Sequence, residues 1–296
     1  MRFSHILLAL LTVTIWGFNF VVIKIGLQGM PPLFFTTMRF TFAAFPLVFF
    51  VPRPTVPWKF LVGWGLAQFA VQFGLLFVGM KLGMSAGLSS LVIQLQAFFT
   101  IGLAWWLLKE QARFAQLLGA GIALAGMAIV AWHLDTPSTF IGLLLVVGAA
   151  CSWAVANLLV KRMKVVNPMS LVVWGSLIAA PVLGVISAVV EGPQSMWSSL
   201  LGMNLISWIT VLFQSYPNTL LGFGIWSMLM RRYPASQVAP FALLVPVVGM
   251  VSGALVLHES MEPWKIIAGV LVLTGLALNQ FAARLRGWME RALTRP

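Results

Sequence analysis

Few side chains that could do chemistry lie inside the apolar runs of this sequence, and most of them are amides. Asn19 lies in a segment that begins at Trp16, and Asn157 in one that begins at Trp153. In both segments a lysine follows the tryptophan eight residues later. An amide both donates and accepts hydrogen bonds, which suits a small polar head group; an interhelical hydrogen bond worth about 0.6 kcal/mol is the alternative. We predict that both asparagines line a binding site and that both tryptophans wall it.

A second pair of amides lies within residues 86–110. Successive residues of a helix are about 100° apart, so Gln94 and Gln96 point roughly 200° away from each other. One of them can therefore face a cavity while the other faces a neighbouring helix, and we favour Gln94 for contact with a ligand. Ser90 shares a face with Gln94 and joins it as a candidate.

Two further groups complete the set of candidates. Gln68 and Gln72 are one turn apart and form a polar stripe that would be costly against lipid. The other group surrounds Pro217, which has no backbone N–H and therefore frees a carbonyl group of its helix. A broken helix at mid-membrane can bind polar groups, and a packing kink is the alternative. The candidates around this proline are Gln214, Tyr216 and Asn218.

Charged side chains inside the apolar runs are cations only. All six acidic residues lie in loops or at run ends, with Glu110 and Glu259 nearest to the runs. A proton relay or a site for cationic drugs usually needs a buried carboxylate, so the sequence favours a neutral, zwitterionic or anionic ligand. Lys24 is expected to reach the outer surface. Arg39 lies deeper and needs a partner: a helix C-terminus, a ligand carboxylate or lipid head groups.

Enzyme and cofactor motifs are missing from the sequence. It contains no Gly-x-x-x-x-Gly-Lys-Ser/Thr, no Gly-x-Ser-x-Gly and no His-Glu-x-x-His. The single cysteine, Cys151, cannot form an intramolecular disulfide, and the three histidines are too scattered for a metal site. No basic face or base-stacking module accompanies the net charge of +12. We therefore expect no catalysis, no cofactor, no metal and no nucleic-acid partner.

The elements that carry these residues must be membrane helices. Hydrophobic residues make up 60% of the 296 residues and charged residues 8%, against about 25% charged in soluble domains. Unbroken apolar runs of roughly 20 residues are typical of transmembrane helices and lack the alternation of a β-barrel. We predict an all-α integral membrane protein with ten transmembrane helices. The predicted spans are 4–27, 31–51, 60–81, 85–108, 114–133, 138–160, 168–190, 203–230, 234–257 and 263–282.

The loops between these runs predict the orientation. If the N-terminus is cytoplasmic, 14 of the 18 lysines and arginines fall on the cytoplasmic side. Positive charge on that side is the rule for membrane proteins, so both termini are predicted to be cytoplasmic, including a basic tail at 284–296. Anionic membrane lipid is the expected partner of these loops.

An internal repeat divides the chain in two. Residues 86–110 match residues 235–259 without a gap, and Gly126 falls on Gly275 in the same register. An odd number of helices in each half makes the second copy inverted relative to the first. We predict repeats at 1–134 and 135–283, with extra residues in the second copy around 191–218. Inverted repeats can open one central site alternately to each side of a membrane.

Six segments carry a resemblance to a known family: 16–27, 30–33, 38–40, 53–57, 87–100 and 238–249. Together they resemble the drug/metabolite transporter superfamily, and within it the EamA-type exporters of amino-acid metabolites. The resemblance implies a secondary exporter of cysteine, O-acetylserine or related small amino acids in the bacterial inner membrane. It also implies a cavity walled by helices 1, 3, 4, 6, 8 and 9, with helices 5 and 10 at the periphery.

The segment 213–218 departs from the family pattern, because it places polar residues and Pro217 in the middle of a span. An exporter of the same fold with another cargo, such as aromatic amino acids, other metabolites or drugs, is therefore the alternative. A homodimer is a further expectation that no residue pattern decides.

Overall fold

The computed structural model describes residues 1–109, 114–133, 137–163, 167–233 and 235–293, and these form helices and no strand. Eight of the described helices are long and apolar enough to cross a membrane. A ninth span is counted if α10 (Pro193–Leu201) and the helix Leu205–Arg232 form one span, with a bend of 108° between them. The tenth predicted span lies in α15 (Pro263–Leu293), whose apolar part Pro263–Asn279 is shorter. The membrane-helical fold is confirmed, whereas the count of ten is not confirmed in full.

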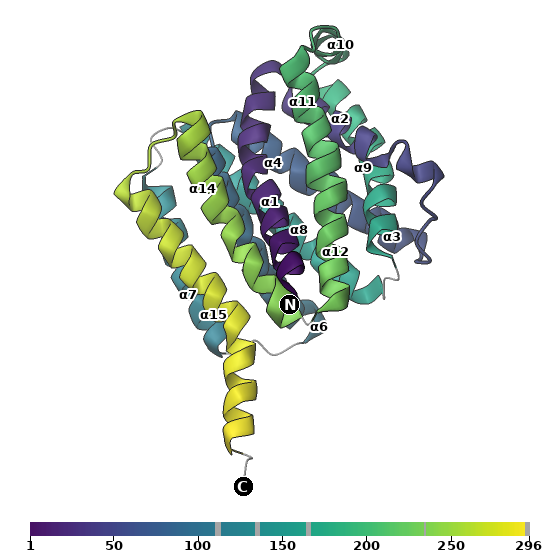
Figure 1. Ribbon diagram of the computed structural model, residues 1–296. Helices are drawn as coiled ribbons and strands as arrows, with labels where there is room; N and C mark the ends of the chain where they lie inside the picture. Colours follow the sequence, from purple (N-terminus) through teal and green to yellow (C-terminus); the bar gives the residue numbers. More distant parts are fainter. Residues whose placement is uncertain (110–113, 134–136, 164–166, 234, 294–296) are drawn as a thin grey trace.

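Several predicted spans consist of more than one helical segment, and the segments run up and down a single bundle (Figure 1). Proline and π-helical or 3₁₀ turns mark the joins. The other helices are α1 (Phe3–Gly29), α2 (Pro32–Ala44), α3 (Trp58–Gly65), α4 (Gln72–Lys81), α5 (Ala86–Val92), α6 (Gln96–Leu108), α7 (Phe114–Trp132), α8 (Pro137–Met163), α9 (Pro168–Val190), α11 (Leu205–Phe213), α12 (Gly222–Arg232), α13 (Ala235–Val238) and α14 (Leu244–Leu257).

Contacts between two helices have counterpart contacts, in which the helices are replaced by their equivalents in the repeat. α1 lies against α14, and its counterpart α8 lies against α6, the counterpart of α14. α4 packs on α8 in the same way as α12 packs on α1, while α2 and α7 pack on their own counterparts α9 and α15. This pattern is that of a two-fold axis between the halves. α7 and α15 lie together at one edge of the bundle (Figure 1), as expected for peripheral helices.

The crossing of α7 and α15 gives the direction of this axis. A Cβ atom on Gly119 would lie 2.6 Å from the carbonyl oxygen of Gly275, and one on Gly126 would lie 2.9 Å from that of Ala268. Early residues of α7 therefore meet late residues of α15, so the two helices are antiparallel. Because Gly126 corresponds to Gly275 in the repeat, the two contacts exchange when the halves exchange. The axis is perpendicular to the spans, and the second half is inverted.

Two π-helical segments interrupt corresponding spans. η2 (Leu66–Val71) separates α3 from α4, and η4 (Gln214–Leu221) separates α11 from α12. In η4 the cause is local: Pro217 has no N–H to donate to the carbonyl of Phe213, so the α-helical pattern cannot continue there. The break predicted at Pro217 is thus a change of helical pitch within a continuous helix. Segments of this kind are frequent at functional sites.

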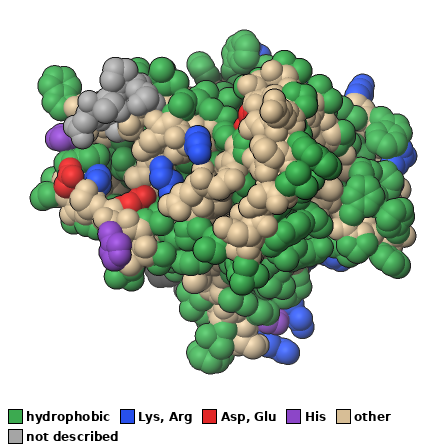
Figure 2. Space-filling view, turned by 90° about the horizontal axis from the view of Figure 1, so that it is seen from above, with side chains coloured by type: hydrophobic (Ala, Val, Ile, Leu, Met, Phe, Trp, Pro, Cys, Tyr) green, Lys and Arg blue, Asp and Glu red, His purple; other side chains and the backbone are tan. Residues whose placement is uncertain are grey.

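α10 is the insertion that the repeat predicts in the second half. It packs on the end of α9 and has no counterpart helix after α2. We call the side of the bundle where it lies the α10 face, at the top of Figure 1, and the opposite side, where Met1 lies, the N-terminal face. Figure 2 views the α10 face, where acidic and basic side chains lie close together within a mostly hydrophobic surface.

Carboxylates on the α10 face bind the starts of helices. Glu259 accepts hydrogen bonds from the backbone N–H groups of Ala86 (2.6 Å) and Gly87 (3.0 Å) at the start of α5. Glu191 does the same at the start of α2, with Leu33 and Phe34 as donors. Such carboxylates satisfy N–H groups that have no partner within the helix and interact favourably with the helix dipole. They tie spans of opposite halves together on this face.

Candidate functional site

Arg39 lies in the interior of the bundle, on α2. Its side chain is 0% exposed, and its Nε and Nη2 atoms donate to Thr219 Oγ1 at 3.2 and 3.1 Å. The guanidinium lies 4.0 Å from the ring centroid of Phe73 and 5.0 Å from that of Phe40. Aromatic faces attract a cation, so these rings replace part of its lost hydration.

No carboxylate pairs with Arg39 among the side chains that the structure describes, because the single ion pair found there joins Lys265 and Glu262. An arginine at the centre of a membrane helix costs about 2.5–3.5 kcal/mol by insertion scales. Its partners here are a hydroxyl and aromatic rings, which carry no negative charge. Among the described side chains, the buried positive charge of Arg39 therefore has no counter-ion.

Arg39 belongs to a polar network that joins α1, α2 and η4. Ser215 Oγ donates to the carbonyl of Arg39 (2.9 Å), and Thr219 Oγ1 donates to that of Gln214 (2.8 Å). Gln214 Nε2 in turn donates to the carbonyl of Asn19 at 3.4 Å. With Asn218, which is buried beside Thr219, these residues form what we call the Arg39 cluster: Asn19, Arg39, Gln214, Ser215, Asn218 and Thr219.

Four buried atoms of the Arg39 cluster have no hydrogen-bond partner. They are Arg39 Nη1 and three amide oxygens, Asn19 Oδ1, Gln214 Oε1 and Asn218 Oδ1. Buried polar groups are normally satisfied, and an unmade hydrogen bond costs about 1–3 kcal/mol. One unpaired donor on a cation and three unpaired acceptors can thus be occupied by a ligand that carries both charges.

Asn157 and Gln96 form a second polar group, on α8 and α6. Asn157 Nδ2 donates to Gln96 Oε1 at 2.8 Å and to Thr100 Oγ1 at 3.1 Å. All three side chains are half-buried, so they bind one another and still remain partly accessible. Gln94, our preferred residue of the pair, is instead buried, and its side chain makes no hydrogen bond to the described residues.

The remaining candidates take separate places. Gln68 Nε2 donates to Gln72 Oε1 at 2.7 Å, so the predicted stripe is a buried pair on η2 and α4. Ser90 Oγ donates to the carbonyl of Gly87 and lies close to Gly249 in the contact between α5 and α14. Tyr216 is 37% exposed, whereas its neighbours Gln214 and Asn218 are buried.

The two tryptophans differ in their surroundings. Trp16 Nε1 donates to the carbonyl of Asn218 at 3.2 Å, and its ring packs on Phe223 and Trp226. It therefore lies directly beside the Arg39 cluster. Trp153 is half-buried and packs against the hydrophobic core.

Sequence reasoning did not select the hydroxyl partners. Thr219 and Ser215 bind Arg39, and Thr100 binds Asn157, yet none of the three was a candidate. Serine and threonine in membrane helices usually bond to the preceding turn, as Thr100 also does with Gln96. The one signal in the sequence was the unpaired cation itself.

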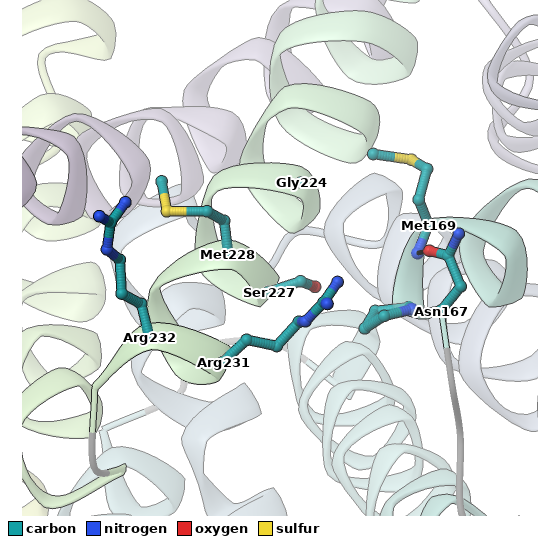
Figure 3. A pocket seen from close by; sticks show the side chains of 8 residues that line it. Asn167, Met169, Gly224, Ser227, Met228, Arg231 and Arg232 are labelled. Atoms are coloured by element: carbon teal, nitrogen blue, oxygen red, sulfur yellow. Dashed lines mark hydrogen bonds between the residues drawn. The ribbon is translucent and has the colours of Figure 1, made fainter.

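A pocket of about 380 Å³ opens at the N-terminal face, between the end of α12 and the start of α9. Figure 3 shows Ser227 and Arg231 of α12 facing Asn167 and Met169 across it. The lining combines two methionines with a cationic rim, which suits a small molecule that has an anionic group. No predicted site residue lines it. The full lining is Asn167, Pro168, Met169, Gly224, Ser227, Met228, Arg231 and Arg232.

Lysines near the α10 face bind carbonyl groups of neighbouring helices. Lys24 Nζ donates to the carbonyls of Met80 (2.9 Å) and Met84 (3.0 Å) at the end of α4. Lys81 Nζ donates to Leu27 at the end of α1. Cations stabilise helix C-termini, so both lysines have a structural role on this face. Glu110, the counterpart of Glu259 in the repeat, lies outside the described residues.

Comparison with known proteins identifies relatives over nearly the whole chain. The model of the EamA-like transporter family matches twice, at residues 3–132 and 140–281. A protein of Escherichia coli named "Probable amino-acid metabolite efflux pump" is 42% identical over 287 residues, covering 94% of this chain and 95% of its own. A Salmonella typhimurium protein of the same name is 41% identical over 285 residues. A crystal structure with 18% identity has a TM-score of 0.64, covers 96% of this chain and 99% of its own, and supports the fold alone.

Proposed function

Because this chain belongs to the EamA-like transporter family, we propose that it exports small amino-acid metabolites from the cytoplasm. Cysteine, O-acetylserine and related small amino acids are the proposed cargo. The two relatives that match over 94% of the chain are named as amino-acid metabolite efflux pumps, which supports this assignment. The embedded amides and the lone embedded arginine support it chemically, since an amino acid offers both donors and a carboxylate.

The proposed mechanism is alternating access between the two inverted halves. The antiparallel contact of Gly119 with Gly275 exchanges with that of Gly126 with Ala268, as rocking about a two-fold axis requires. On the α10 face, Glu259 and Glu191 tie helices of opposite halves together. On the N-terminal face a pocket is open. We take this arrangement as the state that faces the cytoplasm.

The proposed binding groups are the residues predicted from the sequence, which include amides of the Arg39 cluster, the hydrogen-bonded Asn157 and Gln96, and the polar pair on η2 and α4. The pocket at the N-terminal face is the proposed vestibule, where Arg231 attracts the carboxylate of the cargo. The α10 face is then periplasmic. The proposed binding residues are Trp16, Asn19, Gln68, Gln72, Ser90, Gln94, Gln96, Trp153, Asn157, Gln214, Tyr216 and Asn218.

Transport by the purified protein in proteoliposomes tests the cargo. Vesicles loaded with radiolabelled L-cysteine or O-acetyl-L-serine are expected to lose label faster than vesicles without protein. Efflux of L-phenylalanine but of neither of these would transfer the assignment to the alternative cargo. No efflux of any amino acid would overturn the proposal.

Labelling with a membrane-impermeant maleimide tests the orientation. Cys151 is the single cysteine, so Cys151→Ser gives a background for single-cysteine variants. Gln194→Cys, exposed on α10, is expected to react from the periplasm of intact cells, and Arg162→Cys, exposed at the end of α8, only after lysis. The reverse pattern would show that the orientation is wrong.

A further inference from the structure

We propose that the Arg39 cluster binds the head group of the cargo, with the guanidinium on its carboxylate and the amide oxygens on its ammonium group. This inference rests on the proposed transport of amino acids and names the residues that recognise them. It makes the free carboxylate the feature that the transporter requires. The cluster is built around Arg39, for which a ligand carboxylate is one of the three partners that the sequence leaves open.

The guanidinium of Arg39 supplies the positive charge of the cluster. Arg39 is fully buried, has no carboxylate partner among the described side chains, and keeps Nη1 unpaired. A guanidinium presents its N–H groups in a fixed fork that fits a carboxylate, and Arg39 uses only Nε and Nη2, both on one hydroxyl. A bound carboxylate would supply both the missing acceptor and the missing negative charge.

The acceptors are three amide oxygens of the Arg39 cluster. Asn19 Oδ1, Gln214 Oε1 and Asn218 Oδ1 are all buried without a partner. An ammonium group has three N–H donors and no acceptor. The unpaired atoms of the cluster are therefore complementary in number and type to a zwitterionic α-amino acid.

The other half of the protein shows that the fold does not require this charge. Pro32 and Ala43-Ala44 of α2 correspond in spacing to Pro168 and Ala179-Ala180 of α9, so Arg39 corresponds to Gly175. A Cβ on Gly175 would lie 2.5 Å from the ring of Trp64, which fills the space there.

The partners of Arg39 are also replaced at the corresponding contact, where α9 packs on η2 as α2 packs on η4. In the register of the repeat, Phe69 and Ala70 of η2 stand where η4 has Asn218 and Thr219. The same helix crossing is thus built once from apolar groups and once around a buried cation. The fold can therefore form this contact without a cation, which indicates that Arg39 serves a function rather than the fold.

Trp16 lies beside the cluster, at a contact between the two halves. Its indole donates to the carbonyl of Asn218 and packs on Phe223 and Trp226. These rings belong to α1 and α12, which lie on opposite sides of the division between the halves. Separation of the halves would move them apart and open the buried cluster, as alternating access requires.

The test compares cargo with and without its carboxylate. In proteoliposomes the wild-type protein is expected to transport L-cysteine and to reject cysteamine, which is the same molecule without the carboxylate. For Arg39→Met, which keeps a long side chain and removes the charge, we expect the KM for cysteine to rise about 30-fold or more and the preference over cysteamine to disappear. The melting temperature is expected to stay or rise, because an apolar residue of similar size replaces a buried charge without loss.

Asn218→Asp gives an independent variant. It places a carboxylate in the cluster and supplies Arg39 with an internal counter-ion. Transport of cysteamine should therefore increase relative to that of cysteine, although Arg39 is unchanged. A purely structural role of Arg39 predicts lower abundance or a lower melting temperature with unchanged selectivity. Unchanged selectivity in either variant at normal abundance overturns the inference.

Failure of the proposed cargo is separable from failure of this inference. If the wild type exports neither cysteine nor O-acetylserine, ligand-induced shifts of its melting temperature with L-phenylalanine and phenethylamine still test the cluster. Stabilisation by the amino acid alone, lost in Arg39→Met, supports the inference. Equal stabilisation by the amine, or none by either compound, overturns it.

Discussion

The carboxylate of Glu259 accepts a hydrogen bond from the backbone N–H of Ala86 at 2.6 Å, which joins the end of α14 to the start of α5. A second bond to Gly87 makes the contact bidentate. The two helices lie in corresponding spans of the repeat, residues 86–110 and 235–259, so this residue closes the α10 face between the halves. Closing that face is a precondition for an opening on the other one.

Removal of this charge is expected to loosen the α10 face. Glu259→Gln keeps one acceptor but loses the charge, and hydrogen bonds to charged groups contribute about 1.5–3 kcal/mol. We expect a lower melting temperature in detergent and faster labelling of Gln194→Cys on the same face. Glu262→Gln is the matched control on the same loop, because its carboxylate binds the nearby Ser260, Trp264 and Lys265 and no helix start, and it should change neither. Equal effects of both substitutions would contradict the assigned role of Glu259.

The close crossing of α7 and α15 gives a prediction about stability. Gly119→Ala places a methyl group 2.6 Å from the carbonyl oxygen of Gly275, so the helices must separate. Overpacking of this kind costs about 1–3 kcal/mol. Gly121→Ala is the control on the same helix, because nothing lies within 4 Å of its Cβ position. Thermal unfolding in detergent should show a lower melting temperature for Gly119→Ala only. Equal melting temperatures of the two variants would refute the contact.

Alanine at the embedded amides should impair transport without reducing membrane abundance. Asn157→Ala and Gln96→Ala each remove one side of the 2.8 Å bond, and we expect the rate to fall about threefold to tenfold in each. Because the two side chains share that bond, the double variant should lose less than the sum of the two losses in free energy. Asn19→Ala and Gln94→Ala test the other candidates in the same assay.

A polar residue at the periphery controls for this series. Gln116→Ala removes a hydrogen bond to Asn279 (3.4 Å) between α7 and α15, and its transport rate should equal that of the wild type. Normal transport in all four amide variants would remove the proposed site.

The vestibule makes a prediction that depends on salt. Arg231→Gln removes a cation from the rim of the pocket at the N-terminal face, so anionic groups should be attracted less strongly. Entry of cargo from that face is expected to slow a few-fold at low ionic strength and to differ less from wild type at high salt. Arg162→Gln, exposed at the end of α8 and outside the pocket, should leave the rate unchanged. A rate defect in Arg231→Gln that salt does not reduce would contradict an electrostatic role.

Most of the architecture could be predicted from the sequence, because the hydrocarbon core dictates helix length and excludes charge. The same physics made Asn19, Asn157 and Gln214 visible as rare polar groups in apolar runs. Which of these polar residues lie together was harder to predict. A π-turn changes the direction of every side chain after it, so the neighbours of Asn218 cannot be read from an α-helical wheel.

The partner of Arg39 was hidden for a different reason. A buried cation suggests a search for a carboxylate, yet Arg39 binds Thr219, a neutral residue far along the chain. Only the packing of α2 on η4 brings the two together.

The mismatch between Arg39 and Gly175 has a consequence for the energetics of the transport cycle. Two identical halves that exchange conformations would give inward and outward states of equal energy, each half populated. The first half here holds Arg39 and the ring of Trp64, and the second half holds Gly175 and the inserted helix α10, so the two states cannot be degenerate. A difference of about 1.4 kcal/mol already gives a tenfold excess of one resting state and a matching difference in the apparent affinity on the two sides. The irregularities of the repeat, rather than its symmetry, therefore decide which side an empty carrier faces.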